Sequence, residues 1–395
     1  MPADMRSARP VLRSVVQRAA VLAVVLLLTS CALWDWMFKT ENPALKPVEL
    51  TPIKDTLNVQ TSWRVAIGSG KGVYLQPAVL ENAVYAASGD GALARIAPET
   101  GQTVWRNEVG AKIGAGVGSD GNTVAIVTIR GEVQAFGADG KMVWKAQAPS
   151  DVASAPLVGR NLVIVRSTDH RITAYEAESG KRRWQYVRNA PPLALRGAPE
   201  LRFAGDNVIV GFPGGRLVAL ALTNGAQRWE ATVSEPKGTT EVERLTDVVG
   251  ALAVSDRDIC AATFQGRAMC ADWANGNVRW SREFAASAGV ARDAERLYSV
   301  DSKAHVAAFA AESGANVWRN EALTNRRLTS PGVTSRATAA GDGFGYVHFF
   351  ALNDGVLIGR TRVDDTPIVA TPRRWADGLV VQTQGGTVAL LTPAR

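Results

Sequence analysis

The stretch Gly101-Gln102-Thr103-Val104-Trp105 contains a pattern, Gly-x-x-x-Trp, whose recurrence along the chain decides the fold. The same pattern returns at Gly140/Trp144, Gly180/Trp184, Gly225/Trp229, Gly276/Trp280 and Gly314/Trp318. Trp63 extends the series towards the N-terminus without the glycine, and Gly355 extends it towards the C-terminus with Gly359 in the tryptophan position. Adjacent tryptophans lie roughly 40–50 residues apart, a period typical of propeller and solenoid repeats.

Each repeat has the same order of elements before its tryptophan. A proline or glycine precedes a short apolar run such as Leu162-Val163-Ile164-Val165, a tight turn follows, and an alternating stretch such as Arg216-Leu217-Val218-Ala219-Leu220 leads to the tryptophan segment. Short runs rich in Val and aromatic residues, separated by glycine turns, are typical of strands joined as hairpins. The sequence therefore predicts an all-β fold of four-stranded antiparallel sheets, and eight repeats of about 42 residues predict an eight-bladed β-propeller.

The two ends of the repeat region complement each other. The segment 61–65 has a tryptophan but no three strands before it, whereas the last repeat has three strands but no tryptophan strand after Leu391. We expect the N-terminal strand to complete the last blade, because this pairing removes two exposed sheet edges. The propeller is predicted to span residues 59–395.

The N-terminus has the layout of an export signal. Four arginines precede the uncharged run 19–28, which is too short to span a bilayer. The run ends in Leu28-Thr29-Ser30-Cys31, which resembles a bacterial lipobox. That resemblance implies that residues 1–30 are removed, that Cys31 is lipidated and that Ala32 directs the protein to the outer membrane; the alternative is an ordinary signal peptide with a chance cysteine. Residues 31–58 are predicted to be a flexible tether, with the folded part in the periplasm.

Composition excludes several classes of protein. Hydrophobic residues make up 46% and charged residues 21% of the 395 residues, which are globular values. The formal charge is +7, of which Arg6, Arg9, Arg13, Arg18 and Asp4 in the predicted signal contribute +3, leaving +4. A charge that small does not favour nucleic-acid binding. Three histidines and three cysteines are too few for a multi-metal or disulfide-framework protein.

Two cysteines lie symmetrically about one predicted turn. Cys260 and Cys270 flank Gln265-Gly266, so they should face each other across a hairpin at close to disulfide distance. The periplasm is oxidising, which favours a disulfide, and two buried free thiols are the alternative. In either state we expect a structural role.

The repeat Leu-x-Ala-hydrophobic-x-x-x-Thr/Ser/Asn-Gly-x-x-x-Trp resembles that of the quinoprotein (PQQ) dehydrogenase propellers, over nearly all of residues 61–391. Family members with methanol-type activity carry a vicinal cysteine pair, which is absent here, and the candidate acids Asp90, Asp139 and Asp301 occupy turn positions. The chain is therefore predicted to be no enzyme and to use no cofactor or metal. A degenerate quinoprotein-like periplasmic enzyme, or another propeller binding protein, is the alternative.

Two consecutive connections between blades break the repeat pattern. Leu193-Ala194-Leu195-Arg196-Gly197 follows Trp184, and the longer connection 230–249 follows Trp229. Both belong to the same class of connection, so they should emerge side by side on one face of the propeller. Apolar residues in long loops on a rigid scaffold suggest a binding surface, although the two leucines could instead tuck under their own loop.

A lipobox, an eight-bladed quinoprotein-like propeller and these two loops together resemble the BamB family of lipoproteins of the outer-membrane β-barrel assembly (Bam) complex. The family's Leu-x-Leu-Arg-Gly loop matches Leu193, Leu195 and Arg196, and its acidic second loop matches Asp247, with Val249 in place of its final aspartate. The resemblance implies binding to the periplasmic POTRA domains of BamA, with two leucine anchors, hydrogen bonds from Arg196, and Asp247 either positioning Arg196 or pairing with the partner. It also implies assistance to unfolded β-barrel proteins, for which no residue here is specific.

Overall fold

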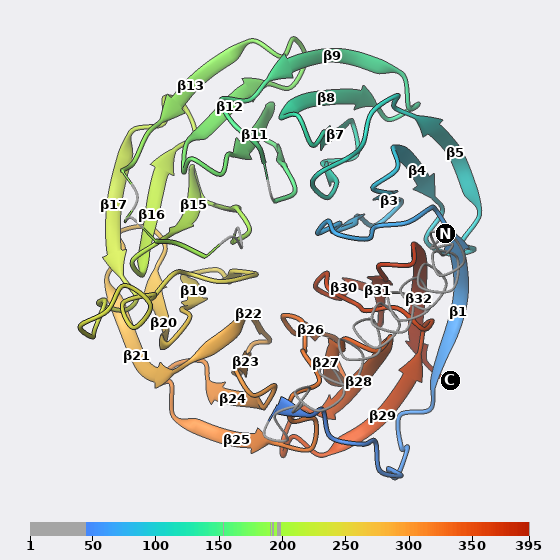
Figure 1. Cartoon of the computed structure of the whole chain (residues 1–395), viewed down its shortest axis with the longest axis vertical. Helices are drawn as coiled ribbons and strands as arrows, with labels where there is room; N and C mark the ends of the chain where they lie inside the picture. Colours follow the sequence, from blue (N-terminus) through green and yellow to red (C-terminus); the bar gives the residue numbers. More distant parts are fainter. Residues whose placement is uncertain (1–44, 153, 190, 192, 196–198, 395) are drawn as a thin grey trace, which may run out of the picture. The chain divides into compact units, whose positions relative to one another are not determined.

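The computed structural model describes residues 45–394 except 153, 190, 192 and 196–198, and its repeat region forms a ring of eight four-stranded antiparallel sheets (Figure 1). The predicted all-β, eight-bladed propeller is confirmed. In every blade the first strand lies nearest the centre of the ring and the fourth lies at its rim. No helix in the described part of the chain is long and apolar enough to cross a membrane.

The first four blades contain sixteen strands in chain order. Blade 1 comprises β2 (Ala78–Val79), β3 (Val84–Ala87), β4 (Ala92–Ile96) and β5 (Thr103–Glu108), and blade 2 comprises β6 (Gly118–Ser119), β7 (Thr123–Val127), β8 (Glu132–Gly137) and β9 (Met142–Gln147). Blade 3 comprises β10 (Leu157–Gly159), β11 (Leu162–Arg166), β12 (Ile172–Glu176) and β13 (Arg182–Tyr186), and blade 4 comprises β14 (Arg202–Ala204), β15 (Asn207–Phe212), β16 (Arg216–Ala221) and β17 (Gln227–Thr232).

The last four blades repeat this arrangement, and the eighth combines the two ends of the propeller. Blade 5 comprises β18 (Ala253–Val254), β19 (Asp258–Ala262), β20 (Gly266–Asp272) and β21 (Val278–Phe284), and blade 6 comprises β22 (Ala286–Arg292), β23 (Arg296–Asp301), β24 (Val306–Ala310) and β25 (Asn316–Asn320). Blade 7 comprises β26 (Gly332–Val333), β27 (Ala337–Gly341), β28 (Tyr346–Ala351) and β29 (Leu357–Arg362), and blade 8 comprises β30 (Arg373–Trp375), β31 (Gly378–Gln382), β32 (Thr387–Pro393) and β1 (Val59–Ala66).

The N-terminal strand closes the ring as the repeat count predicts. β1 pairs antiparallel with β32, with Val65 opposite Val388 and Val59 opposite Pro393. Both ends of the propeller are thereby held in one sheet. The edges of β1 and β32 that face each other are paired and not exposed to solvent.

The hydrophobic core is divided into clusters between neighbouring blades. One cluster joins Ala125 and Trp144 of blade 2 to Val163 and Tyr175 of blade 3. The second strand of a blade is buried on both faces, as in β11, whereas in an outer strand such as β13 only the tryptophan is buried. A single blade has no solvent-protected face, so stacking in the ring provides the burial that stabilises each sheet.

The glycine and the tryptophan of the repeat act across a blade boundary. Trp63 at the rim of blade 8 donates its indole N–H to the carbonyl of Pro98 in blade 1, at 2.7 Å. Gly101 lies against the Trp63 ring so closely that a Cβ atom there would be 2.6 Å from it, and its φ of +74° is the left-handed conformation that favours glycine. The other six periodic tryptophans make the same donation to the next blade, at Trp105, Trp144, Trp184, Trp229, Trp280 and Trp318.

The boundary between blades 7 and 8 differs, because the fourth strand of blade 8 is β1, which comes from the opposite end of the propeller. Gly359 occupies the tryptophan position of β29, and its nearest neighbours are side-chain atoms of Val59 and Leu57. Leu57 is 5% exposed and belongs to the core cluster of blades 7 and 8. A leucine from the segment before β1 therefore fills the space that an indole fills elsewhere, which explains the missing tryptophan.

The tether predicted over 31–58 is too long, because its last part packs against the propeller. Arg326 donates to the carbonyl of Val48 at 3.1 Å, and Arg360 donates through two nitrogens to the carbonyl of Thr51 at 3.2 Å. We call residues 48–58 the strap. The sequence of the strap has no strand or helix period, so only the tertiary structure reveals these contacts.

The register of blade 5 places Cys260 directly opposite Cys270, as the spacing about Gln265-Gly266 predicts. Their Cα atoms are 4.1 Å apart, both side chains are fully buried, and the two sulfur atoms are joined in a disulfide. The bridge lies in the core between blades 5 and 6, consistent with a structural role.

Candidate functional site

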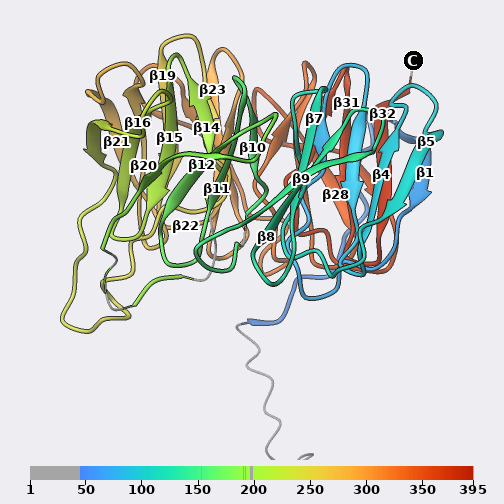
Figure 2. The same cartoon turned by 90° about the horizontal axis from the view of Figure 1, so that it is seen from above.

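Two loops project from the same face of the propeller, and both leave the fourth strand of one blade for the first strand of the next (Figure 2). The first, 187–201, joins β13 to β14, and the second, 233–252, joins β17 to β18. We call the face that carries them the loop face. Glu230 belongs to β17 rather than to the second loop, so this loop begins three residues later than the sequence suggests.

Asp247 connects the two loops through its carboxylate. The amide of Leu195 in the first loop donates to Oδ2 at 2.6 Å, and the amide of Gly214 in the turn after β15 donates to Oδ1 at 3.1 Å. Asp247 is 4% exposed, so its carboxylate is directed into the propeller rather than towards solvent. The sequence left two roles open for Asp247; this geometry favours positioning, and the group that it positions is the backbone at Leu195.

Arg166 supplies a buried positive charge in the same region. Burial lowers the pKa of Arg166 to about 10, and the attraction of Asp247 opposes this shift. The guanidinium lies over the Phe212 ring at 5.4 Å from its centroid, and one of its nitrogens is 3.4 Å from Nδ1 of His170. Arg166 therefore remains charged at neutral pH, and its guanidinium is attracted to the carboxylate of Asp247.

An ion pair holds the base of the first loop. Arg188 donates through two nitrogens to the two carboxylate oxygens of Glu230, at 2.8 and 2.9 Å. This fork-shaped pairing raises the pKa of Arg188 and lowers that of Glu230. Arg188 also lies over Phe212, 5.5 Å from the ring centroid. The first loop is thus attached at its start to blade 4 by Arg188, and further along to the second loop by Asp247.

The two leucines of the first loop have different environments. Leu193 is 41% exposed, whereas Leu195 is half-buried and lines a hollow of about 570 Å³ in the loop face. Val249, Phe264 and Leu328 also line this hollow. Val249 is the residue that departs from the BamB pattern, and it presents a methyl-bearing wall where the family has a carboxylate. The hollow is therefore suited to an apolar side chain.

The second loop presents one apolar residue that the sequence analysis did not single out. Val242 is 60% exposed and lies in a short helical turn that Glu243 stabilises. Oε2 of Glu243 accepts from the amides of Thr239 and Thr240, at 2.8 and 3.1 Å, and these hydrogen bonds lower its pKa. Thr-x-x-Glu is the sequence signal for such a capped turn. The cap fixes the backbone of the turn that carries Val242.

Two predicted site residues lie outside the described residues. These are Arg196, which follows Leu195 in the first loop, and the lipidation residue Cys31. The structure brings together Leu195, Asp247 and Val249, with Leu193 exposed beside them. Cys260 and Cys270 lie in the core between blades 5 and 6 and take no part in this group of residues.

Comparisons with known proteins match this architecture to one family. A family model described as outer membrane protein assembly factor BamB matches residues 89–320. The outer membrane protein assembly factor BamB of Bordetella pertussis is 41% identical over 388 residues, which are 98% of this chain and 99% of that protein. The crystal structure of BamB from Moraxella catarrhalis superposes with a TM-score of 0.78 at 25% identity, covering 85% of this chain and 99% of that one.

A quinohemoprotein alcohol dehydrogenase from Comamonas testosteroni has a similar fold but a distant sequence. Its TM-score is 0.63 at 14% identity, over 87% of this chain and 79% of that one. At that identity the likeness concerns the propeller alone. The repeat, the closure of the ring and the 41% identity over nearly the full length agree: this chain belongs to the BamB family of outer membrane protein assembly factors.

Proposed function

We propose that this chain is a non-catalytic scaffold lipoprotein of the Bam complex at the periplasmic face of the outer membrane, where its loop face binds the POTRA domains of BamA and assists the folding and insertion of β-barrel proteins. Family membership and the resemblance of the two loops support the partner. The observation that carries the proposal is the hydrogen bond from the Leu195 amide to Asp247, which holds an apolar loop in a fixed position on the surface.

The proposed interface presents apolar side chains from both loops. Leu193 and Val242 are exposed apolar residues on two fixed loops, and Leu195 borders an apolar hollow. Burial of a leucine in a partner pocket contributes about 1.5–3 kcal/mol. Because binding energy concentrates in a few central residues, the two leucines are expected to account for much of the affinity.

The interface is tested by replacing both leucines with alanine and measuring affinity for the purified POTRA domains of BamA. We expect the Leu193→Ala/Leu195→Ala variant to bind about 100-fold more weakly or worse, with an unchanged melting temperature. The control is Val143→Ala/Val278→Ala, which removes two exposed valines from the outer strands β9 and β21. Equal affinity of the leucine variant and the wild type, with both folded, would place the interface elsewhere.

Lipid anchoring is tested at Cys31. Replacement of Cys31 by alanine removes the thiol that would carry the acyl chains, so the protein is expected to leave the outer-membrane fraction. Acyl labelling with fractionation measures this. An acylated Cys31→Ala protein in the outer membrane would contradict the lipobox assignment.

The absence of catalysis is a separate part of the proposal. It is supported by the names of the relatives, which are assembly factors rather than dehydrogenases. Titration of the purified protein with PQQ and calcium, followed by calorimetry, separates a scaffold from a degenerate quinoprotein. We expect no saturable heat, and stoichiometric binding of PQQ would favour the enzyme.

A further inference from the structure

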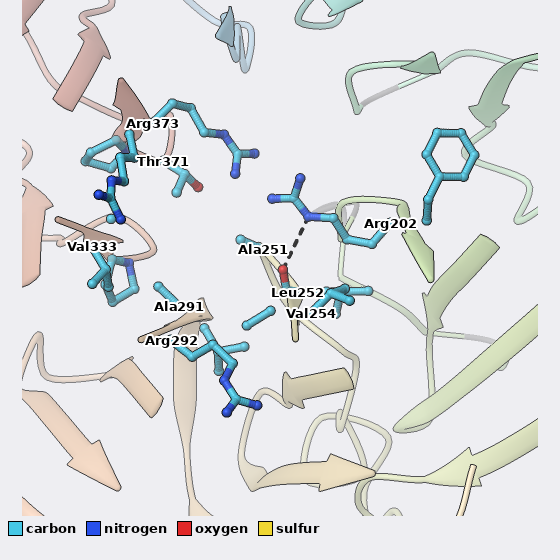
Figure 3. A pocket seen from close by; sticks show the side chains of 16 residues that line it. Arg202, Ala251, Leu252, Val254, Ala291, Arg292, Val333, Thr371 and Arg373 are labelled. Atoms are coloured by element: carbon cyan, nitrogen blue, oxygen red, sulfur yellow. Dashed lines mark hydrogen bonds between the residues drawn. The ribbon is translucent and has the colours of Figure 1, made fainter. Parts of the chain in front are cut away.

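The innermost strands of blades 4 to 8 surround a second cavity, of about 330 Å³, whose wall contains four arginines (Figure 3). Arg202 comes from β14 and Arg373 from β30, and their guanidinium groups point towards one another across the cavity (Figure 3). Arg374 also lines the cavity, and Arg292 forms an ion pair with Asp258, with Nη1 3.2 Å from Oδ2. Arg202 and Arg373 are therefore the two guanidinium groups that face each other inside the cavity.

A single carboxylate contacts both facing arginines. Oε2 of Glu200 lies 2.8 Å from Nη2 of Arg202 and 2.5 Å from Nη2 of Arg373. Arg202 also donates through Nε to the carbonyl of Leu252, at 3.3 Å. Two positive charges therefore share one negative charge, which leaves a net positive charge between them.

The arginines retain hydrogen-bond donors beyond these contacts. A guanidinium carries five N–H donors, and among the described residues Arg373 uses only Nη2, in its contact with Glu200. Burial lowers the pKa of Arg202; the carboxylate of Glu200 opposes this effect, and the charge of Arg373 adds to it. Glu200 raises the pKa of Arg373 despite its burial, so both arginines are charged at neutral pH and face each other across the cavity.

We propose that the cavity binds a small oxyanion, a phosphate or carboxylate group, between the guanidinium groups of Arg202 and Arg373. Guanidinium groups recognise planar or tetrahedral oxyanions through paired N–H donors, and a recess lined by one sign of charge concentrates counter-ions. The cavity volume accommodates a ligand of a few non-hydrogen atoms rather than a folded partner. The cavity shares no lining residue with the hollow that Leu195 lines.

The experiment is calorimetric titration of the purified full-length protein, at low ionic strength, with sodium pyrophosphate and, in a second arm, with citrate. The wild type is expected to bind at one site, and the two probes show whether the site prefers phosphate or carboxylate oxygens. Arg373→Gln should weaken binding about tenfold or more, because a charge-assisted hydrogen bond is lost. Glu200→Gln should tighten binding, because it removes the competing carboxylate.

Two further variants make the result decisive. Arg374 is exposed, so Arg374→Gln keeps the fold and should weaken binding even where Arg373→Gln lowers stability. Arg130 is exposed in a turn of blade 2 and lies outside the cavity wall, so Arg130→Gln is a charge-matched control that should bind like the wild type. No saturable binding, equal weakening in Arg130→Gln and Arg374→Gln, or weaker binding by Glu200→Gln would each overturn the proposal.

Discussion

At the scale of single residues, Asp247 determines how the first loop is presented. Its two carboxylate oxygens accept backbone hydrogen bonds from two different segments, at Leu195 and at Gly214. An asparagine has one acceptor oxygen, so Asp247→Asn leaves one of these amides without a partner and also removes the charge that attracts Arg166. Asp247 is therefore a positioning residue of the proposed interface.

We expect Asp247→Asn to lower the free energy of unfolding by about 1.5–3 kcal/mol and to weaken POTRA binding about tenfold. Chemical denaturation and the affinity assay measure the two effects. Asp354→Asn is the control, because Asp354 is an exposed turn residue whose carboxylate accepts a single hydrogen bond among the described residues, from the amide of Val356. Unchanged affinity of Asp247→Asn would mean that the loop keeps its conformation without this carboxylate.

A second residue-scale prediction concerns pH. Burial lowers the pKa of His348, against the opposing effect of Asp342, whose Oδ2 is 2.9 Å from Nε2 of the ring. Below its ordinary pKa of about 6.5, His348 takes up a proton in the unfolded chain but not in the folded protein. Stability therefore decreases as the pH falls from 7 towards 5.

The measurement is the free energy of unfolding at pH 7.5 and pH 5.0. His348→Gln removes the titrating group and keeps an N–H donor for Asp342, so this variant should lose less stability on acidification than the wild type. His170, whose pKa burial also lowers, contributes to both proteins alike. An identical pH dependence in the two proteins would show that His348 titrates alike in the folded and unfolded states.

At the scale of elements, the β19–β20 hairpin carries the Cys260–Cys270 bridge. A cross-link that closes a loop of this length stabilises a protein by about 3 kcal/mol in the chain-entropy description. We expect the free energy of unfolding of Cys260→Ala/Cys270→Ala, measured by chemical denaturation, to be lower than that of the wild type by that amount. Thiol counting on the denatured, unreduced Cys31→Ala protein provides the direct check: no free thiol is expected, and two free thiols would contradict the bridge.

At the scale of the whole molecule, ring closure depends on β1 and on the strap before it. Three truncated chains test this dependence. The chain that begins at residue 48 lacks the segment before the strap, the chain that begins at residue 59 also lacks the strap, and the chain that begins at residue 67 also lacks β1. We expect the first to unfold like the wild type and the second to lose about 2–5 kcal/mol, the usual effect of deleting a buried leucine such as Leu57. The third exposes the edge of β32 and should lose cooperative unfolding.

Thermal unfolding by circular dichroism separates the three chains. Leu57→Ala in the full-length protein is the matched point variant and should reproduce most of the second result. Leu45→Ala is its control, because Leu45 is exposed. Equal melting temperatures for the chains that begin at residues 48 and 59 would show that the strap adds no stability.

Most of the fold followed from the sequence because a propeller is built from local units. Each Gly-x-x-x-Trp repeat marks a turn and a strand within about 40 residues, so periodicity alone predicts the number of blades and the pairing of β1 with β32. The Cys260–Cys270 register followed in the same way, since two residues equidistant from a hairpin turn face each other. The position of the two loops on one face was predictable because they are the same kind of connection.

Other features depend on contacts between segments far apart in the chain, which no local pattern encodes. Leu57 takes the place of an indole beside Gly359, and these two residues are about 300 positions apart in the chain. The local sequence therefore predicted a flexible tether where the strap packs against the propeller. Asp247 contacts Leu195 from another loop, and Glu200 contacts Arg373 from across the ring. The sequence by itself determined the repeat, its closure and the loops that differ from it. The tertiary structure alone decided which side chains meet, because ring closure brings the innermost strands and inter-blade loops together irrespective of their separation in the chain.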